Sequence, residues 1–324
     1  MYASVMAALL LIGCSTSALA QDTADFWAAR DTVLAHGPGH SNVRVGIWDS
    51  GVDTTLFRDK LARDANGTLI LGGYDAFKER QDIPMAVLPD SIAARSSELG
   101  RQLRALDDLG DGIDSEEAMA FKAWIDAQAP EEQDRSYASI DRYSGYVHGT
   151  AVADIALAGL ADAEIVIARM EWWHGSPPLP CWTHEFADKE AASIRDLLDF
   201  QVAQGVRVVV MSWGRAERSY LGNLKECAPE LSDSARAALA HYTVERIRAE
   251  LIAGMRAAPQ VLFVGAAGNQ GKSLEAADQA TRFSLPNFLL VGAADAEGEN
   301  MDWSNYGDEV TLLGRGERVP ARLP

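Results

Sequence analysis

Apolar and polar residues follow two different periods along most of the chain. Short apolar runs rich in β-branched residues predict strands that are buried on both faces. These runs occupy residues 43–48, 69–74, 163–170, 206–211, 261–264, 288–293 and 310–313. Longer segments with helical spacing, or with small apolar residues throughout, predict helices over 150–159, 188–204 and 232–258. Strands that alternate with helices indicate βαβ units and a mostly parallel sheet, hence an α/β fold.

Residues 75–147 interrupt this alternation with a charged, alanine-rich region. Helical spacing predicts helices over 92–106 and 115–128, the second with Ser115 as its N-cap. Pro130 is suited to the first position of a third helix. We interpret the region as a helical insertion into the sheet domain.

An acidic stretch separates the first two of these helices and partly resembles a calcium-binding loop. With Gly112 at the sixth position, Asp107 and Asp111 fit the first and fifth. However, Leu109 stands at the third position and Ala118 at the twelfth, where the loop needs a bidentate glutamate. We therefore expect an acidic turn between helices and assign no metal ligand, with a calcium loop as the alternative.

Composition restricts the class of protein. The chain has 324 residues, of which 48% are hydrophobic, enough for a sizeable core. Its formal charge is −18, and such an acidic surface repels nucleic-acid phosphates. We expect a monomer with no nucleic-acid partner.

The first twenty residues are typical of an export signal. Residues 5–12 form a short apolar core, and the Ala-Leu-Ala at 18–20 fits a cleavage site. Residues 11–14 resemble a bacterial lipobox, which would instead give a lipid anchor through Cys14. We expect an exported protein of the bacterial periplasm, cell envelope or medium. Residues 21–42 are interpreted as a linker or N-terminal strap.

Beyond the signal the chain has two cysteines, Cys181 and Cys227. Two cysteines in an exported protein can form a disulfide. Two unpaired thiols fit the sequence equally, because sequence separation does not report distance.

Three polar motifs stand at the ends of predicted elements. Asp49 begins an Asp-Ser-Gly turn directly after the first strand, and His148 begins a His-Gly-Thr segment before a buried helix. Asn269 follows Ala-Ala-Gly after the strand at 261–264. Each motif alone is compatible with a turn or a helix cap. Open α/β sheets, however, place their chemistry at the carboxyl ends of the strands.

Together and in this order, the motifs resemble those of the subtilisin-like serine proteases (subtilases, peptidase family S8). The resemblance covers residues 43–324, although Ala151 stands where a second histidine is usual. It implies a three-layer subtilisin-like fold with a mostly parallel sheet and a helical insertion. It also implies an exported serine endopeptidase that hydrolyses polypeptides by an Asp-His-Ser mechanism. Structural calcium is common in this family, but we place no calcium site and expect no other cofactor.

The resemblance also implies a role for each motif. Asp49 would orient His148, and His148 would move the proton between a serine hydroxyl and the leaving amine. The side-chain amide of Asn269 would donate a hydrogen bond to the oxyanion. A strand segment of the specificity pocket would pair with the extended substrate through Ser212, Trp213 and Gly214.

The family's nucleophilic serine lies in a Gly-Thr-Ser-Met-Ala stretch that opens a buried helix, and this sequence contains no such stretch. We assign the role to none of Ser50, Ser212 and Ser304. We therefore expect the final serine-bearing helix to be missing, the chain to be a fragment that is inactive as given, and an apolar face of the sheet to be exposed.

Two other functions are alternatives. A non-catalytic subtilase-like protein could bind a peptide or partner without the serine. A nucleotide-binding α/β protein is disfavoured, because residues 265–271 lack the G-x-G-x-x-G spacing and the lysine of a phosphate-binding loop.

Overall fold

The computed structural model describes residues 26–35, 37, 42–171 and 181–324. A sheet of seven strands forms the centre of the fold, in the order β2-β3-β1-β4-β5-β6-β7. All neighbouring strands are parallel. The strands are β1 (Val43–Asp49), β2 (Leu71–Tyr74), β3 (Ala163–Met170), β4 (Val208–Met211), β5 (Leu262–Ala266), β6 (Phe288–Ala294) and β7 (Leu312–Arg315).

Each of these strands was predicted from an apolar run, and no end differs from the prediction by more than two residues. β1 lies inside the sheet between β3 and β4, so both of its faces are covered. Trp48 is fully buried towards one layer, and Ile47 is 1% exposed towards the other. The alternation of these two side chains places the end of β1 between two cores.

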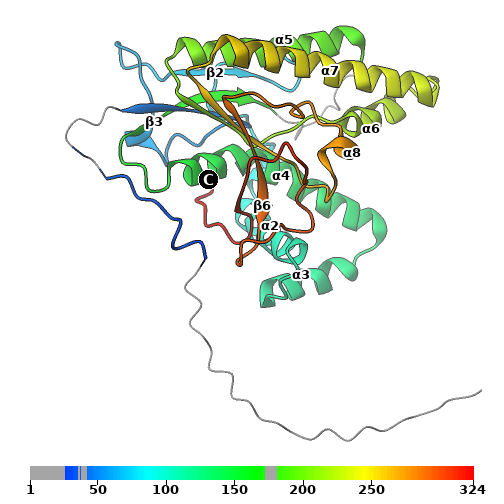
Figure 1. Ribbon diagram of the computed structural model, residues 1–324. Coiled ribbons are helices and arrows are strands. Elements are labelled where there is room, and N and C mark those ends of the chain that lie inside the picture. Colours follow the sequence, from blue (N-terminus) through cyan, green and yellow to red (C-terminus); the bar gives the residue numbers. More distant parts are fainter. Residues whose placement is uncertain (1–25, 36, 38–41, 172–180) are drawn as a thin grey trace, which may run out of the picture.

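Helices cover the sheet in two layers. Helices α5 (His184–Ala203) and α7 (Asp233–Ala257) lie side by side over one face, at the top of Figure 1. Helix α4 (Pro130–Leu157) lies on the opposite face and packs on β1. The arrangement confirms the predicted three-layer α/β fold. Helix α6 (Glu217–Cys227), which packs on α7, and the short α8 (Leu274–Ala277) were not predicted, and the helix predicted over 92–106 is divided into two.

The expected start of the buried helix near His148 is wrong. Helix α4 begins at Pro130 and continues for 28 residues, so His148 lies well inside it. The apolar side chains of Ile140, Tyr143 and Val147 are buried against the insertion and keep this stretch helical. The third helix of the insertion and the helix that carries His148 are therefore one continuous element.

The insertion forms a small helical layer with its own core. Helices α1 (Asp90–Ala93), α2 (Ser96–Gly110) and α3 (Glu116–Asp126) pack against the first half of α4 around Leu99 and Phe121. The expected turn is shorter than predicted: α2 continues to Gly110 and includes Asp107, so only the residues from Asp111 to Ser115 connect α2 to α3. Burial, together with Asp111 and Asp108, raises the pKa of Asp107 to about 6.

Cys181 and Cys227 form a disulfide, with 5.4 Å between their Cα atoms. The bond joins the segment before α5 to the end of α6, and so decides between the two alternatives for these cysteines. Residues 172–182 contain three prolines, a composition that predicts a loop, and most of this stretch lies outside the described residues.

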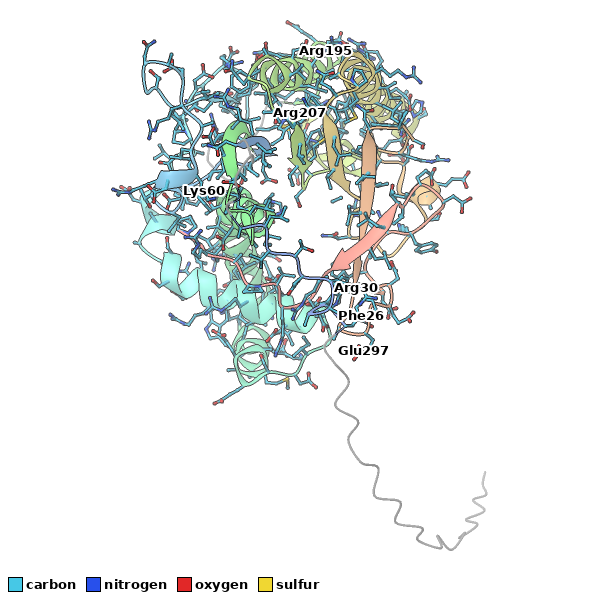
Figure 2. All side chains as sticks on the ribbon, turned by 60° about the vertical axis from the view of Figure 1, so that its left-hand side comes forward. Phe26, Arg30, Lys60, Arg195, Arg207 and Glu297 are labelled. Carbon is cyan, nitrogen blue, oxygen red and sulfur yellow. A yellow bond between two sulfur atoms is a disulfide. The ribbon has the colours of Figure 1, made fainter. Side chains whose placement is uncertain are left out.

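The described part of the N-terminal strap lies against the sheet domain. Figure 2 shows Phe26 and Arg30 beside Glu297, in the turn after β6. The indole nitrogen of Trp27 donates to the carbonyl oxygen of Asp295 at 2.7 Å. Further along, Leu34 forms a β-bridge with Leu160. Among the helices described, none is long and apolar enough to cross a membrane.

Candidate active site

A carboxylate and an imidazole meet at the carboxyl end of the central strand. Asp49 is the last residue of β1 and is fully buried, and His148 projects from α4 with its side chain 33% exposed. The Nδ1 atom of His148 lies 2.7 Å from Oδ1 of Asp49, across 99 residues of sequence. Because an ionised carboxylate only accepts hydrogen bonds, Nδ1 carries the proton and donates. The structure thus brings together the two residues that sequence analysis paired.

The turn after β1 and the helix around His148 are interlocked. The backbone N–H of Gly149 donates to Oγ of Ser50 at 3.1 Å, and the N–H of Asp53 donates to Oγ1 of Thr150 at 3.0 Å. A Cβ atom on Gly149 would lie only 2.2 Å from the carbonyl oxygen of Gly51. A glycine is therefore required for α4 to approach β1 closely enough for the carboxylate–imidazole contact.

The electrostatic environment of His148 suits a general base. Burial lowers the pKa of its imidazole, but the charge of Asp49 and the hydrogen bond to it together outweigh that effect. The net result is a pKa above the ordinary 6.5. The ring can accept a proton from a hydroxyl, and the carboxylate stabilises the imidazolium that forms.

Asn269 is exposed in the loop after β5. Since β4 and β5 follow β1 in the sheet, this loop shares the sheet edge that carries Asp49. Gly268 has a φ of 97°, a conformation that favours glycine. Asn269 is thus accessible at the same edge of the sheet as Asp49.

Asn305 fixes the conformation of this loop through hydrogen bonds to its backbone. This role was not predicted from the sequence. Its side-chain N–H donates to the carbonyl oxygen of Ala267 at 2.9 Å, and its Oδ1 accepts from the backbone N–H groups of Gln270 and Lys272. It is fully buried. The sequence around it, Trp-Ser-Asn-Tyr-Gly at 303–307, offers no local sign of these distant partners, although a buried asparagine needs hydrogen bonds of this kind.

Gln279 fills the space between Gly214, in the segment expected to line the specificity pocket, and Gly268, next to the expected oxyanion donor. A Cβ atom on Gly214 would lie 2.6 Å from Oε1 of Gln279, and one on Gly268 would lie 2.0 Å from its Nε2. Nε2 also donates to the carbonyl oxygen of Ala267 at 3.0 Å. Sequence analysis did not identify Gln279, because its role depends on the approach of two separate loops.

Contacts with buried side chains hold the segment after β4 in place. Trp213 is buried and packs edge-on against Trp48, with 5.0 Å between the ring centroids. The guanidinium of Arg215 donates to the buried carboxylate of Glu190 at 3.0 Å, and Lys78 lies 3.7 Å from the same carboxylate. Burial raises the pKa of Glu190, but the two cations outweigh it and lower the pKa overall. Gly214 stays exposed.

The three serines considered above have different settings. Ser50 accepts the Gly149 hydrogen bond, and Oγ of Ser304 accepts from the backbone N–H of Ala293 at 2.9 Å. Both are buried. Ser212 is half-buried at the wall of a cavity. Two of the three hydroxyls thus support the local fold.

That cavity has a volume of about 830 Å³ and lies between α4 and the strands β1, β4 and β5. Its lining is largely apolar, so an apolar face of the sheet is accessible, as expected. The lining residues include Val45, Val152, Ile155, Val208, Val210 and Val264.

The sequence model of the subtilase family, Peptidase S8, matches residues 40–320. The chain therefore belongs to the subtilase family of serine proteases. No curated protein matches the sequence.

Three solved structures illustrate what this chain is similar to. A lanthipeptide protease is 15% identical over 85% of this chain and 55% of its own, with a TM-score of 0.43. The PatG macrocyclase in complex with a peptide is 14% identical over 88% of this chain and 68% of its own, with a TM-score of 0.45. The epidermin leader peptide processing protease of Staphylococcus aureus is 12% identical over 86% of this chain and 53% of its own, with a TM-score of 0.43. This chain thus spans little more than half the length of the two proteases.

Proposed function

We propose that this chain provides the acid–base pair and the oxyanion donor of a serine endopeptidase that acts on polypeptides. The observation that carries the proposal is the 2.7 Å contact between His148 and the buried Asp49 in a chain of the subtilase family. His148 would take the proton of a serine hydroxyl as the oxygen attacks the peptide carbonyl carbon. It would then give that proton to the leaving amine as the C–N bond breaks. The Asn269 amide would stabilise the oxyanion formed in between.

We also propose that the serine is supplied by a small-residue helix that packs into the apolar cavity beside α4. Val152, which lines the cavity, lies four residues after His148 and thus on the same face of α4. A helix seated there would bury the valines of three strands, and its N-terminal end could bring a hydroxyl to the imidazole.

Labelling with a fluorophosphonate tests both proposals. We expect the 324-residue chain to remain unlabelled, because a serine activated by His148 is needed for the reaction. A reading frame that continues past codon 324 into a Gly-Thr-Ser helix should give a protein that is labelled, and His148→Ala should abolish its labelling. Clean labelling of the 324-residue chain would contradict the proposed origin of the serine. A continued frame without the serine motif would favour a non-catalytic peptide-binding protein.

We propose that the protein is exported to an oxidising compartment. The Cys181–Cys227 disulfide supports this proposal, because structural disulfides persist mainly outside the cytosol. The predicted signal and the alternative lipid site at Cys14 lie outside the described residues.

Gln279 occupies the space between Gly214 and Gly268. We therefore expect the serine-bearing protein to prefer substrates with a small residue before the scissile bond. We expect Gln279→Ala to open the pocket between Gly214 and Gly268. In the serine-bearing protein, kcat/KM for a substrate with phenylalanine at this position should then rise at least about 10-fold relative to one with alanine. The ratio of the two kcat/KM values is the measurement, with Gln204→Ala, at the end of α5, as the control. An unchanged ratio in Gln279→Ala would remove Gln279 from the specificity pocket.

A further inference from the structure

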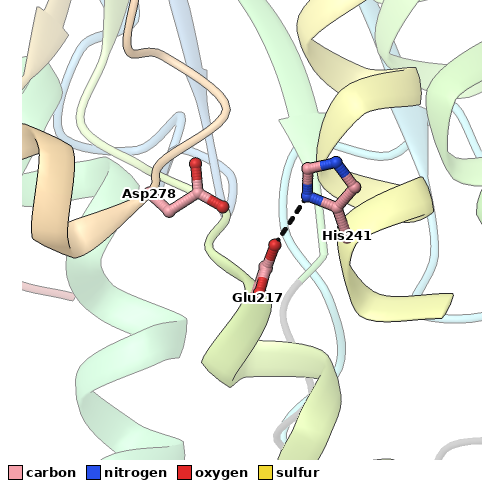
Figure 3. A group of neighbouring side chains, drawn as sticks. All are labelled: Glu217, His241 and Asp278. Carbon is pink, nitrogen blue, oxygen red and sulfur yellow. Dashed lines mark hydrogen bonds and ion pairs between the residues drawn. The ribbon is translucent and has the colours of Figure 1, made fainter. Parts of the chain in front are cut away.

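A second cluster of potential ligand atoms lies outside the candidate active site. Glu217 begins α6, His241 lies in α7, and Asp278 follows α8 (Figure 3). One ligand atom from each side chain lies within 4.8 Å of the others, and Nδ1 of His241 is 2.8 Å from Oε1 of Glu217. Three elements that are distant in sequence therefore direct an imidazole and two carboxylates to one point.

We propose that Glu217, His241 and Asp278 bind a zinc ion. Zinc takes histidine nitrogen and carboxylate oxygen together, whereas calcium and magnesium prefer oxygen ligands alone. Zinc bonds to such ligands are about 2.0–2.2 Å long, so the three ligand atoms, now within 4.8 Å of one another, would move closer together around the ion. Three protein ligands leave one position of a tetrahedral site for water.

The surroundings support an ion at this point. The side chains of Glu217, His241 and Asp278 are 29%, 60% and 32% exposed, so a hydrated ion can reach them. The guanidinium of Arg248 lies 3.2 Å from Oδ1 of Asp278 and fixes that carboxylate from outside the cluster. Such partners orient metal ligands in protein sites. With a neutral imidazole, the cluster has two negative charges and one adjacent cation.

An ion at this position would link two segments of the chain that already pair with each other. Ala216 and Gln279 form an antiparallel β-bridge, and the N–H of Ala280 donates to the carbonyl oxygen of Arg215 at 2.7 Å. Glu217 directly follows one residue of this bridge, and Asp278 directly precedes the other. A bound ion would therefore clamp the segment that carries Gly214 to the one that carries Gln279.

Calorimetric titration of the chelator-treated 324-residue chain with zinc tests the proposal. We expect one saturable site whose affinity falls at least ~10-fold in His241→Ala and in Glu217→Gln, which retains a hydrogen-bonding group without the charge. Zinc should raise the unfolding temperature of the wild-type chain but not of His241→Ala. His184→Ala, which removes an exposed histidine of α5, should bind zinc as the wild type does.

Three binding results, and a fourth from the unfolding temperature, would contradict the proposed zinc site. The first is an absence of saturable binding, which would leave the His241–Glu217 contact as an ion pair. The second is equal affinity in the wild type and His241→Ala. The third is loss of binding in His148→Ala alone, which would place the ion at the Asp49–His148 pair. Calcium that raises the unfolding temperature as much as zinc would contradict the role of the imidazole. None of these readouts depends on peptidase activity, so the zinc site and the proposed function can fail separately.

Discussion

Replacing Asp49 with asparagine is expected to lower the kcat for peptide hydrolysis by the serine-bearing protein about 10⁴-fold, the size of loss seen when the aspartate of such triads is removed. The amide keeps the shape of the side chain but removes the charge that stabilises the imidazolium. It can also donate to Nδ1 of His148, which would move the proton to the nitrogen that must accept one. The measurement is kcat on a peptide substrate, with circular dichroism to show that the variant is folded.

Asp53→Asn is the matched control for this substitution. Asp53 lies in the same turn, and its Oδ1 accepts from the backbone N–H of Thr55 at 2.8 Å. Asparagine can maintain that hydrogen bond, so kcat should change less than about 10-fold. Near wild-type kcat in Asp49→Asn would show that the buried carboxylate takes no part in catalysis.

Replacing Gly149 with alanine is expected to have the largest effect on stability. The new Cβ would lie 2.2 Å from the carbonyl oxygen of Gly51 and 2.9 Å from its backbone nitrogen. Backbone atoms cannot rotate away, so α4 must move from β1. The cost is expected to be about 3 kcal/mol or more in the free energy of unfolding. Urea denaturation measures it.

Gly222→Ala is the control for helical glycines. Nothing lies within 4 Å of a Cβ built on Gly222, which is inside α6. Alanine there should leave stability unchanged or raise it by up to about 1 kcal/mol. Equal effects of the two substitutions would contradict the close approach of α4 to β1.

Much of the sheet could be predicted from the sequence, because runs such as Val-Val-Val-Met in β4 are apolar enough to indicate buried parallel strands on their own. The start of α4 could not be predicted from the sequence. Whether the helix begins at Pro130 or near His148 depends on the packing of Ile140 and Tyr143 against the insertion, and that contact joins distant segments. The short α8 has too few residues for a periodic pattern.

The candidate site likewise contains some residues that could be predicted from the sequence and some that could not. Asp49, His148 and Asn269 stand in local motifs that the sequence displays. Gln279 and Asn305 act on loops far from them in sequence, so only the folded chain shows the contacts. The Glu217–His241–Asp278 cluster likewise comes from three separate elements, and no spacing along the chain connects its members.

The contact between Asp49 and His148 is the central claim, and an NMR titration of the His148 ring tests it without a nucleophile. In the 324-residue chain its pKa should lie above the ordinary 6.5, because the charge and hydrogen bond of Asp49 outweigh burial. In Asp49→Asn the burial is left unopposed, so the pKa should fall below 6.5. Equal pKa values in the two proteins, or a wild-type value below 6.5, would contradict the account.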